Sequence, residues 1–418
     1  MKTLILKNAS QVVTCSGFAA KKGLEMNDIG VLENASVVVQ DEKIVEVGCA
    51  IDFSKYSGAE ILDCTGKTIM PGFVDSHTHF VFGGYRDDEY NWRLRGDSYM
   101  DIMQRGGGIA NSVNATRSAS KEDLMAVGKK RLDSMVRFGV TTVEGKSGYG
   151  LDYETEIKQL EVMKALNENH SMDIVMTFMG AHSVPVDYKG RGGEFIDFLI
   201  ENVMPEVKQR KLAEFCDIFC EQNVFSIEES RRLLNAATSM GFKTKIHADE
   251  IVQLGGAELA AEVGCTSADH LLQASDSGIL AMADKNVIAT VLPCTAFSLR
   301  EHFARARKMI DDGCAVAVAT DFNPGSCFTE SIPLAIALCT LNMQMTIEEV
   351  VSALTINGAA AVGRADQIGS IDVGKQADLV IHEFPSYKFL PYHIGVSTVE
   401  KVIKKGRLIF DATLIQVL

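Results

Sequence analysis

The stretch IMPGFVDSHTHF, residues 69–80, decides how the rest of the chain is interpreted. In it, a short apolar strand leads into two histidines, His77 and His79, at spacing i, i+2. On a β-strand this spacing places both imidazoles on one face. Two neutral imidazoles side by side form half of a tetrahedral metal site. A bare His-x-His pair is often structural, but the Pro-Gly turn and Asp75 just before this one favour a metal site.

The composition is that of a soluble, globular chain of enzyme size. The chain has 418 residues, 46% of them hydrophobic, and a formal net charge of −14, which argues against nucleic acids and anionic membranes as partners. No apolar run approaches the roughly 18 residues of a membrane span, and the N-terminus lacks a signal-peptide pattern. Ten cysteines without a disulfide pattern predict reduced thiols and a cytoplasmic location.

Three regions differ in their sequence pattern. Residues 1–65 and 366–418 contain short strands with polar turns, and we expect them to pair in one small, discontinuous β-sandwich-like domain. Residues 66–365 alternate short apolar strands with amphipathic helices. The strands are IMPGFVDSH, GVTTVEGKS, DIVMTFMGAH, CDIFCEQ, KTKIHADE, TSADHL, VIATVLP and AVAVATDF. Eight strands with intervening helices predict an α/β chain with a (β/α)8 barrel of the TIM type, whose active site lies at the carboxyl ends of the strands.

Histidines and acids gather where the predicted barrel strands end. In chain order they are His77, His79, His182, His247, Glu250, His270 and Asp321. Five of the nine histidines are among them, which core packing explains poorly because a buried histidine must satisfy two ring nitrogens. The sequence therefore predicts a divalent metal ion with four ligands: His77, His79, His247 and Asp321. These ligands leave room for a water molecule, whose pKa such an ion lowers from roughly 15.7 to about 7.

The fourth predicted strand bears on the number of metal ions. In a barrel of this kind a second ion usually needs a bridging group at the end of that strand, commonly a lysine. The segment CDIFCEQNVF offers Glu221 but no lysine. We therefore expect one ion, zinc in preference to iron, and expect Glu221 to be structural or to lie behind the ligands.

Several motifs resemble those of the metal-dependent amidohydrolase superfamily along the whole chain, namely PGFVDSHTH, KIHADE, SADHL and ATDFNPG. Longer runs resemble one family within it, the imidazolonepropionases, which hydrolyse a cyclic amide in histidine breakdown. These runs are HFVFGGYRDDE, GGGI, EGKSGYGLDYETE, FMGAHSVP, IHADEI, GGAELA and TDFNPGS. The resemblance implies that water opens 4-imidazolone-5-propanoate at its lactam C–N bond and gives N-formimidoyl-L-glutamate.

The residue types suit that reaction. A ring amide needs an activated water, a polarised carbonyl and a proton for the departing nitrogen. Glu250 follows the ligand His247 and can carry a proton between the water and the ring nitrogen. His270 can orient the water or polarise the carbonyl. Asp321 can act both as ligand and as proton acceptor, and the sequence leaves open which of these three catalytic candidates takes the first proton.

The resemblance also assigns a substrate pocket. Arg86, in the loop after the first barrel strand, is expected to hold the propionate, because a bidentate arginine suits a carboxylate. A salt bridge with a neighbouring acid, Asp87, Asp88 or Glu89, is the alternative. The other expected pocket residues are Tyr149, His182, Glu250, Asn323, Gly325 and Ser326. The turn at 323–326 is expected to present backbone N–H groups to a carboxylate.

Two other functions stay open at this point. A related deaminase acting on a heterocyclic base shares the histidines and acids at the strand ends, although an uncharged base has no need of Arg86. A non-catalytic scaffold on the same barrel would lose ligands, whereas this chain keeps all of them. The partner is then a small-molecule substrate, and since barrels of this class often dimerise, a homodimer is compatible with the sequence.

Overall fold

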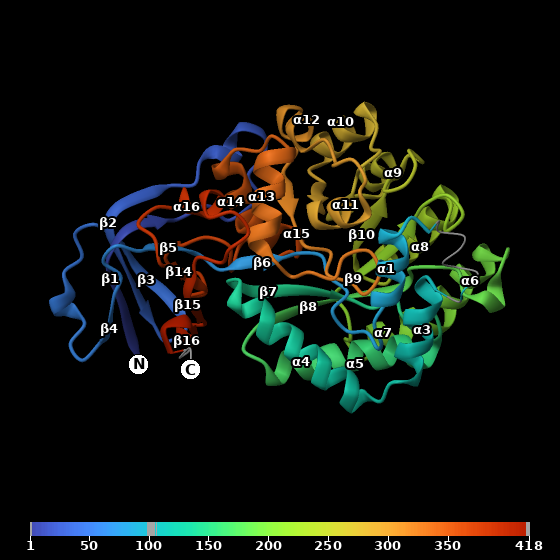
Figure 1. Ribbon diagram of the computed structural model, residues 1–418, viewed down its shortest axis with the longest axis horizontal. Helices are drawn as coiled ribbons and strands as arrows, with labels where there is room; N and C mark the ends of the chain where they lie inside the picture. Colours follow the sequence, from blue (N-terminus) through green and yellow to red (C-terminus); the bar gives the residue numbers. More distant parts are fainter. Residues whose placement is uncertain (1, 98–104, 106, 415–418) are drawn as a thin grey trace.

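The computed structural model describes residues 2–97, 105 and 107–414, so Gly106 of the GGGI run lies outside the described part. Two sheets lie next to each other (Figure 1). One is a ring of parallel strands with helices around it, and the other is a mixed sheet built from both ends of the chain. No helix in the described ranges has the length and apolar character needed to cross a membrane.

The parallel sheet confirms the predicted barrel. Its strands pair in chain order, each with the next. They are β6 (Phe73–Asp75), β7 (Val140–Lys146), β8 (Asp173–Ala181), β9 (Phe215–Cys220), β10 (Lys243–Ala248), β11 (Ser267–His270), β12 (Ile288–Val291) and β13 (Val316–Val318). The ring closes just beyond the last and first strands, where Asp321 N donates to His77 O at 3.0 Å and His79 N donates to Phe322 O at 2.9 Å. Closure thus occurs at the residues expected to bind the metal.

Helices connect the barrel strands and cover the outside of the ring (Figure 1). Several begin where a serine, threonine or aspartate side chain accepts a backbone N–H, as Ser226 does from Glu229 N and Asp152 does from Thr155 N. The helices are α1 (Asp87–Leu94), α3 (Ile109–Ser118), α4 (Lys121–Arg137), α5 (Tyr153–Asn169), α6 (Gly192–Phe198), α7 (Met204–Gln209), α8 (Ile227–Ser239), α9 (Gly256–Val263), α10 (Asp276–Lys285), α11 (Pro293–Leu299), α12 (Ala306–Asp311), α13 (Ile332–Asn342), α14 (Ile347–Leu354) and α15 (Ile356–Ala361).

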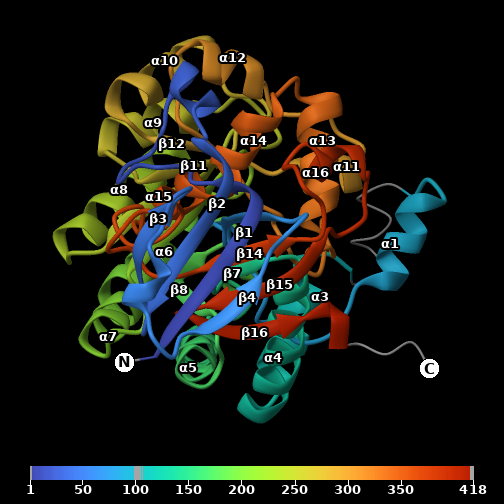
Figure 2. The same cartoon turned by 90° about the vertical axis from the view of Figure 1, so that its left-hand side faces the viewer.

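The terminal sheet joins the two ends of the chain, as predicted, in one mixed sheet (Figure 2). Its strand order is β16-β15-β14-β5-β1-β2-β3, with β4 also paired to β1. The strands are β1 (Thr3–Val13), β2 (Val31–Gln40), β3 (Lys43–Gly48), β4 (Glu60–Asp63), β5 (Thr68–Pro71), β14 (Leu379–His382), β15 (Val399–Lys404) and β16 (Arg407–Asp411). The short helix α16 (Phe389–Tyr392) lies between β14 and β15. The sheet has an apolar core of its own that includes Leu6, Val37 and Leu379.

The chain passes from one sheet to the other at Gly72. The sequence treats IMPGFVDSH as one strand, but β5 belongs to the terminal sheet and β6 to the barrel. The terminal sheet therefore extends past the expected boundary at residue 65. A glycine is needed at the crossing because a Cβ on Gly72 would overlap the Thr141 side chain.

Candidate metal centre

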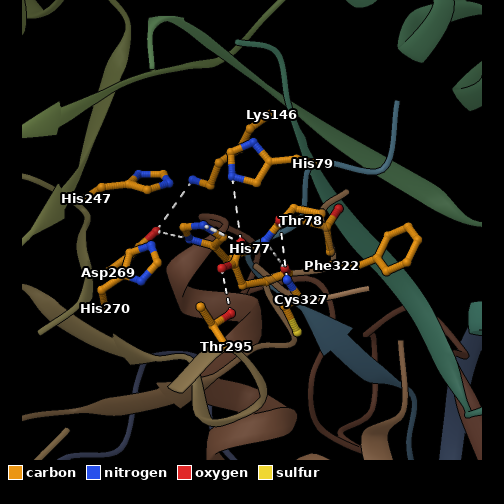
Figure 3. A network of polar contacts seen from close by, with 12 residues as sticks. His77, Thr78, His79, Lys146, His247, Asp269, His270, Thr295, Phe322 and Cys327 are labelled. Atoms are coloured by element: carbon orange, nitrogen blue, oxygen red, sulfur yellow. Dashed lines mark hydrogen bonds and ion pairs between the residues drawn. The ribbon is translucent and has the colours of Figure 1, made fainter. Parts of the chain in front are cut away.

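The four predicted ligands come together at the carboxyl end of the barrel (Figure 3 labels the three histidines). One ring nitrogen from each of His77, His79 and His247 lies within 4.8 Å of the others. Asp321 Oδ1 lies 3.6 Å from His77 Nε2 and 3.8 Å from His79 Nε2. All four side chains are buried.

These donors fit a metal ion. Among the described residues, His77 Nε2 and His247 Nε2 are buried without a hydrogen-bond partner, and such a polar atom is costly unless something binds it. Burial, followed by neighbouring positive charge, lowers the pKa of His77, His79 and His247 well below its usual value. The imidazoles are therefore neutral, which is the form that binds a divalent ion.

Asp321 is held in place by its neighbours. Thr295 Oγ1 donates to Asp321 Oδ2 at 2.6 Å. The backbone of Asp321 has φ 53°, a left-handed conformation that is costly for a residue other than glycine and often marks a functional position. Burial raises the pKa of Asp321 to about 7. This carboxylate is thus kept at the mouth of the barrel without an ion pair to a lysine or arginine in the described ranges.

Two aspartates that sequence reasoning missed lie behind the histidines. Asp269 Oδ2 is 2.7 Å from His77 Nδ1, and Asp217 Oδ2 is 3.1 Å from His247 Nδ1. The contact at His77 is a hydrogen bond, and such a carboxylate fixes the orientation and tautomer of an imidazole. Asp217 lies close to His247 Nδ1, but that nitrogen has no hydrogen-bond partner in the described ranges. The available signal was an acid inside a predicted barrel strand, in CDIFC and SADH.

Lysines balance these buried acids. Lys146 Nζ lies 2.7 Å from Asp217 Oδ2 and 3.4 Å from Asp269 Oδ2. Lys245 Nζ lies 2.6 Å from Glu144 Oε2. Burial opposes ionisation of Asp269, but Lys245 and Lys146 outweigh it and lower the pKa of that carboxyl. Burial also opposes the charge on Lys146, but Asp217 and the other carboxylates raise its pKa.

Glu250 and His270 lie beside the metal ligands. Glu250 Oε1 is 3.5 Å from His270 Nδ1, and the His270 ring is 5.0 Å from that of His247. Burial, and then the nearby Asp321, raise the pKa of Glu250 to about 8. Burial lowers the pKa of His270 to about 4. A carboxyl group with a pKa near neutrality is suited to accepting and releasing protons.

The loop that carries Glu250 is fixed by two carboxylates. Asp249 accepts the backbone N–H groups of residues 254–257 at 2.9–3.0 Å. Glu221 accepts Ile251 N at 2.8 Å. Glu221 therefore acts on the loop backbone, in agreement with the structural role expected for it.

The expected substrate residues lie on one side of the ligands. The His182 ring stacks on His79 with a centroid distance of 4.7 Å, and the Tyr149 ring is 5.3 Å from His182. Arg86 reaches Gly325, where an added Cβ would overlap its Nη1. Arg86 Nε also donates to Glu89 Oε2 at 2.8 Å, so the salt bridge considered as the alternative is present, while the far end of the guanidinium lies against Gly325.

The turn after Asp321 differs from the expectation in one respect. Gly325 N and Ser326 N donate to Asn323 Oδ1 at 2.9 and 2.8 Å. The prediction that these N–H groups face a ligand carboxylate is therefore wrong. The side chain of Asn323 closes the turn on itself, an arrangement that asparagine favours.

Comparison with known proteins places the chain in a family. The model of the amidohydrolase family matches residues 68–409. An imidazolonepropionase of Clostridium tetani is 65% identical over 97% of this chain and 98% of its own length. The chain belongs to the imidazolonepropionase family. A relative with the same name from Parabacteroides distasonis is 56% identical over 97% of the chain and 98% of its own length.

Solved structures share the fold. A triazine hydrolase from Arthrobacter aurescens superposes with a TM-score of 0.77 at 15% identity, covering 98% of this chain and 95% of that one. An adenosine deaminase from Xanthomonas campestris with bound zinc has a TM-score of 0.71 at 20% identity, with 97% and 92% covered. The predicted family, fold and enzyme class are confirmed, and the scaffold alternative is dropped.

Proposed function

We propose that the chain hydrolyses the lactam C–N bond of 4-imidazolone-5-propanoate to give N-formimidoyl-L-glutamate in histidine degradation. The observation that carries this proposal is the 65% identity to an imidazolonepropionase over nearly the whole length of both chains. The residues that the reaction needs are grouped at the end of the barrel, which supports the same conclusion.

We assign the metal to His77, His79, His247 and Asp321. A single divalent ion held there would activate a water molecule and polarise the ring carbonyl. Zinc is the preferred ion, because tetrahedral histidine and carboxylate sites suit it and a zinc-bound deaminase shares the fold. Iron is the alternative.

We assign proton transfer to Glu250 and His270. Glu250 can accept a proton at one carboxyl oxygen and release it near neutral pH, because its pKa is raised to about 8. His270 is neutral, since burial lowers its pKa to about 4, and its Nδ1 is 3.5 Å from Glu250 Oε1. It can orient the water or the carbonyl by hydrogen bonding. Asp321 is assigned as ligand and as a further proton acceptor.

We assign recognition of the propionate to Arg86. Its guanidinium lies against Gly325, a position where only a residue without a Cβ leaves room for it. His182, which stacks on His79, and Tyr149, which meets His79 edge-on, are assigned to the imidazolone ring. Asn323, Gly325 and Ser326 are assigned to the pocket wall. A deaminase for an uncharged base gives no reason for a partly buried arginine here.

Substitution of the arginine tests the assignment. Arg86→Met should lower kcat/KM for the natural substrate by about 10²-fold, because a charged hydrogen bond contributes about 1.5–3 kcal/mol. The metal content should not change. For an analogue with a neutral amide in place of the propionate, wild type and Arg86→Met should be equally slow. An equal loss on both substrates would make Arg86 a structural partner of Glu89.

We infer a cytoplasmic location from the ten free cysteines, nine of which are buried. A homodimer stays a prediction of the sequence, and light scattering during size exclusion would test it. Conversion of 4-imidazolone-5-propanoate, followed by mass spectrometry of N-formimidoyl-L-glutamate, is the direct test of the activity. Release of ammonia from a heterocyclic base, with no such conversion, would favour the deaminase instead.

A further inference from the structure

A group of buried charges lies behind the metal ligands, inside the barrel. It contains Glu144, Asp217 and Asp269 as acids and Lys146 and Lys245 as bases, and every one of these side chains is fully buried. Charges without solvent are costly unless they are paired. Packing alone therefore does not explain a cluster of this size in the middle of a barrel.

Lys146 contacts two carboxylate oxygens that each lie beside a proposed metal ligand. Its Nζ is 2.7 Å from Asp217 Oδ2, the atom that lies 3.1 Å from His247 Nδ1. It is also 3.4 Å from Asp269 Oδ2, the atom that lies 2.7 Å from His77 Nδ1. One ammonium group thus contacts the two carboxylate oxygens that meet the two imidazoles (Figure 3 shows the Asp269 side of this arrangement).

The same acids could otherwise bind a cation. Ligand atoms of His77, Glu144 and Asp269 lie within 4.8 Å of one another, a spacing suitable for a metal ion. The Lys146 ammonium already lies 3.1 Å from Glu144 Oε1 and 3.4 Å from Asp269 Oδ2. A lysine side chain therefore supplies the positive charge at this place.

We propose that Lys146 is a positioning residue of the metal centre, whose ammonium group takes the place of a second cation, holds Asp269 as the acceptor for His77 and keeps Asp217 beside His247. An ionised acceptor at Nδ1 keeps the proton on that nitrogen and leaves the Nε2 lone pair free. The His77 imidazole is then oriented for metal before it binds. The inference rests on the proposed metal-dependent function.

The wild-type protein provides the first test. In the metal-free protein, nitrogen-15 NMR of the histidine side chains, assigned with His77→Gln, should show the proton of the His77 ring on Nδ1. A proton on Nε2 of that ring would overturn the inference. If the same preparation binds zinc and hydrolyses the substrate, that failure leaves the proposed function intact. If it neither binds zinc nor hydrolyses the substrate, the result contradicts the proposed function itself.

Removal of the lysine provides the second test. Lys146→Met should weaken zinc binding at least tenfold, as loss of a group that supports metal ligands does, and should shift the His77 ring proton from Nδ1 in the metal-free protein. The matched control is Lys404→Met, because Lys404 is also buried and lies between two aspartates, Asp173 and Asp378, neither of which contacts a predicted metal ligand in the described ranges. Its zinc affinity should stay within about threefold of wild type. Equal weakening in both variants would overturn the role of Lys146, and the NMR test holds even if Lys146→Met does not fold.

Discussion

Two regions of the molecule place a buried lysine between two aspartates, and they differ in what the aspartates contact next. At the metal centre Lys146 lies between Asp217 and Asp269. Where the terminal sheet meets the barrel, Lys404 Nζ lies 2.8 Å from Asp173 Oδ2 and 2.7 Å from Asp378 Oδ2.

The second group is complete in itself. Asp173 also accepts from Gln376 Nε2 at 3.0 Å, and Asp378 accepts Lys405 N at 3.0 Å. At the metal centre the aspartates contact imidazoles instead, and the opposite ring nitrogens of His77 and His247 have no partner in the described ranges. The same arrangement of charges is therefore structural at the terminal sheet, where its polar groups have partners. At the metal centre, ring nitrogens of the histidines are left without a partner, and their lone pairs are available to bind a ligand.

Removal of the metal should have the largest effect, and only at one of the two regions. Chelation should abolish hydrolysis, because the ion activates the water. The far-UV circular dichroism of the whole protein should stay unchanged, because the terminal sheet does not depend on the ion. Elemental analysis should give about one zinc per chain in the active protein. Full activity after chelation would show that the reaction needs no metal. Two tightly held ions per chain would refute the single-ion assignment.

Glu250→Gln should have the second-largest effect on activity. The glutamine has nearly the same shape but carries no proton, and general acid–base catalysis contributes about 10²–10⁴-fold. Turnover should fall by that factor with zinc content unchanged. A drop of less than about tenfold would assign the proton transfer to His270 or Asp321. Loss of zinc in this variant would make Glu250 a ligand.

Lys404→Met should act on stability alone. Removal of one partner from a buried ion pair leaves an unpaired charge and costs about 3–5 kcal/mol. The free energy of unfolding in urea should fall accordingly, while kcat/KM of the folded protein stays within about twofold of wild type. A large loss of activity in the folded variant would show that the two regions are coupled and would end the contrast between them.

Lowering the pH should have a smaller effect, which concerns the stability of the terminal sheet. Burial opposes ionisation of Asp173, but Lys404, Lys405 and Gln376 outweigh it and lower its pKa from 3.8 to about 2. A lowered folded-state pKa contributes stability above pH 3.8 that is lost as the pH falls towards 2. In that window the melting temperature of wild type should fall more steeply than that of Asp173→Asn. Parallel curves would contradict the role of this pair.

The sequence by itself determined the barrel, the terminal sheet and the grouping of His77, His79, His247 and Asp321 at the barrel end. Strand and helix patterns are local, so the eight barrel strands could be recognised one at a time. His77 and His79 lie two residues apart on one strand end, and the other ligands end strands of the same kind. Because parallel strands bring their carboxyl ends to one face of a barrel, these positions could be placed together before any coordinates.

Only the tertiary structure decided which groups meet behind the ligands. Lys146, Asp217 and Asp269 come from three different strands, and their contacts depend on the register with which the barrel closes. A slip of one residue would turn each side chain to the opposite face. The crossing at Gly72 and the self-closed turn at Asn323 depend likewise on contacts that no local pattern records. Residue type and spacing therefore predicted which side chains meet at the barrel end, and strand register decided what lies behind them.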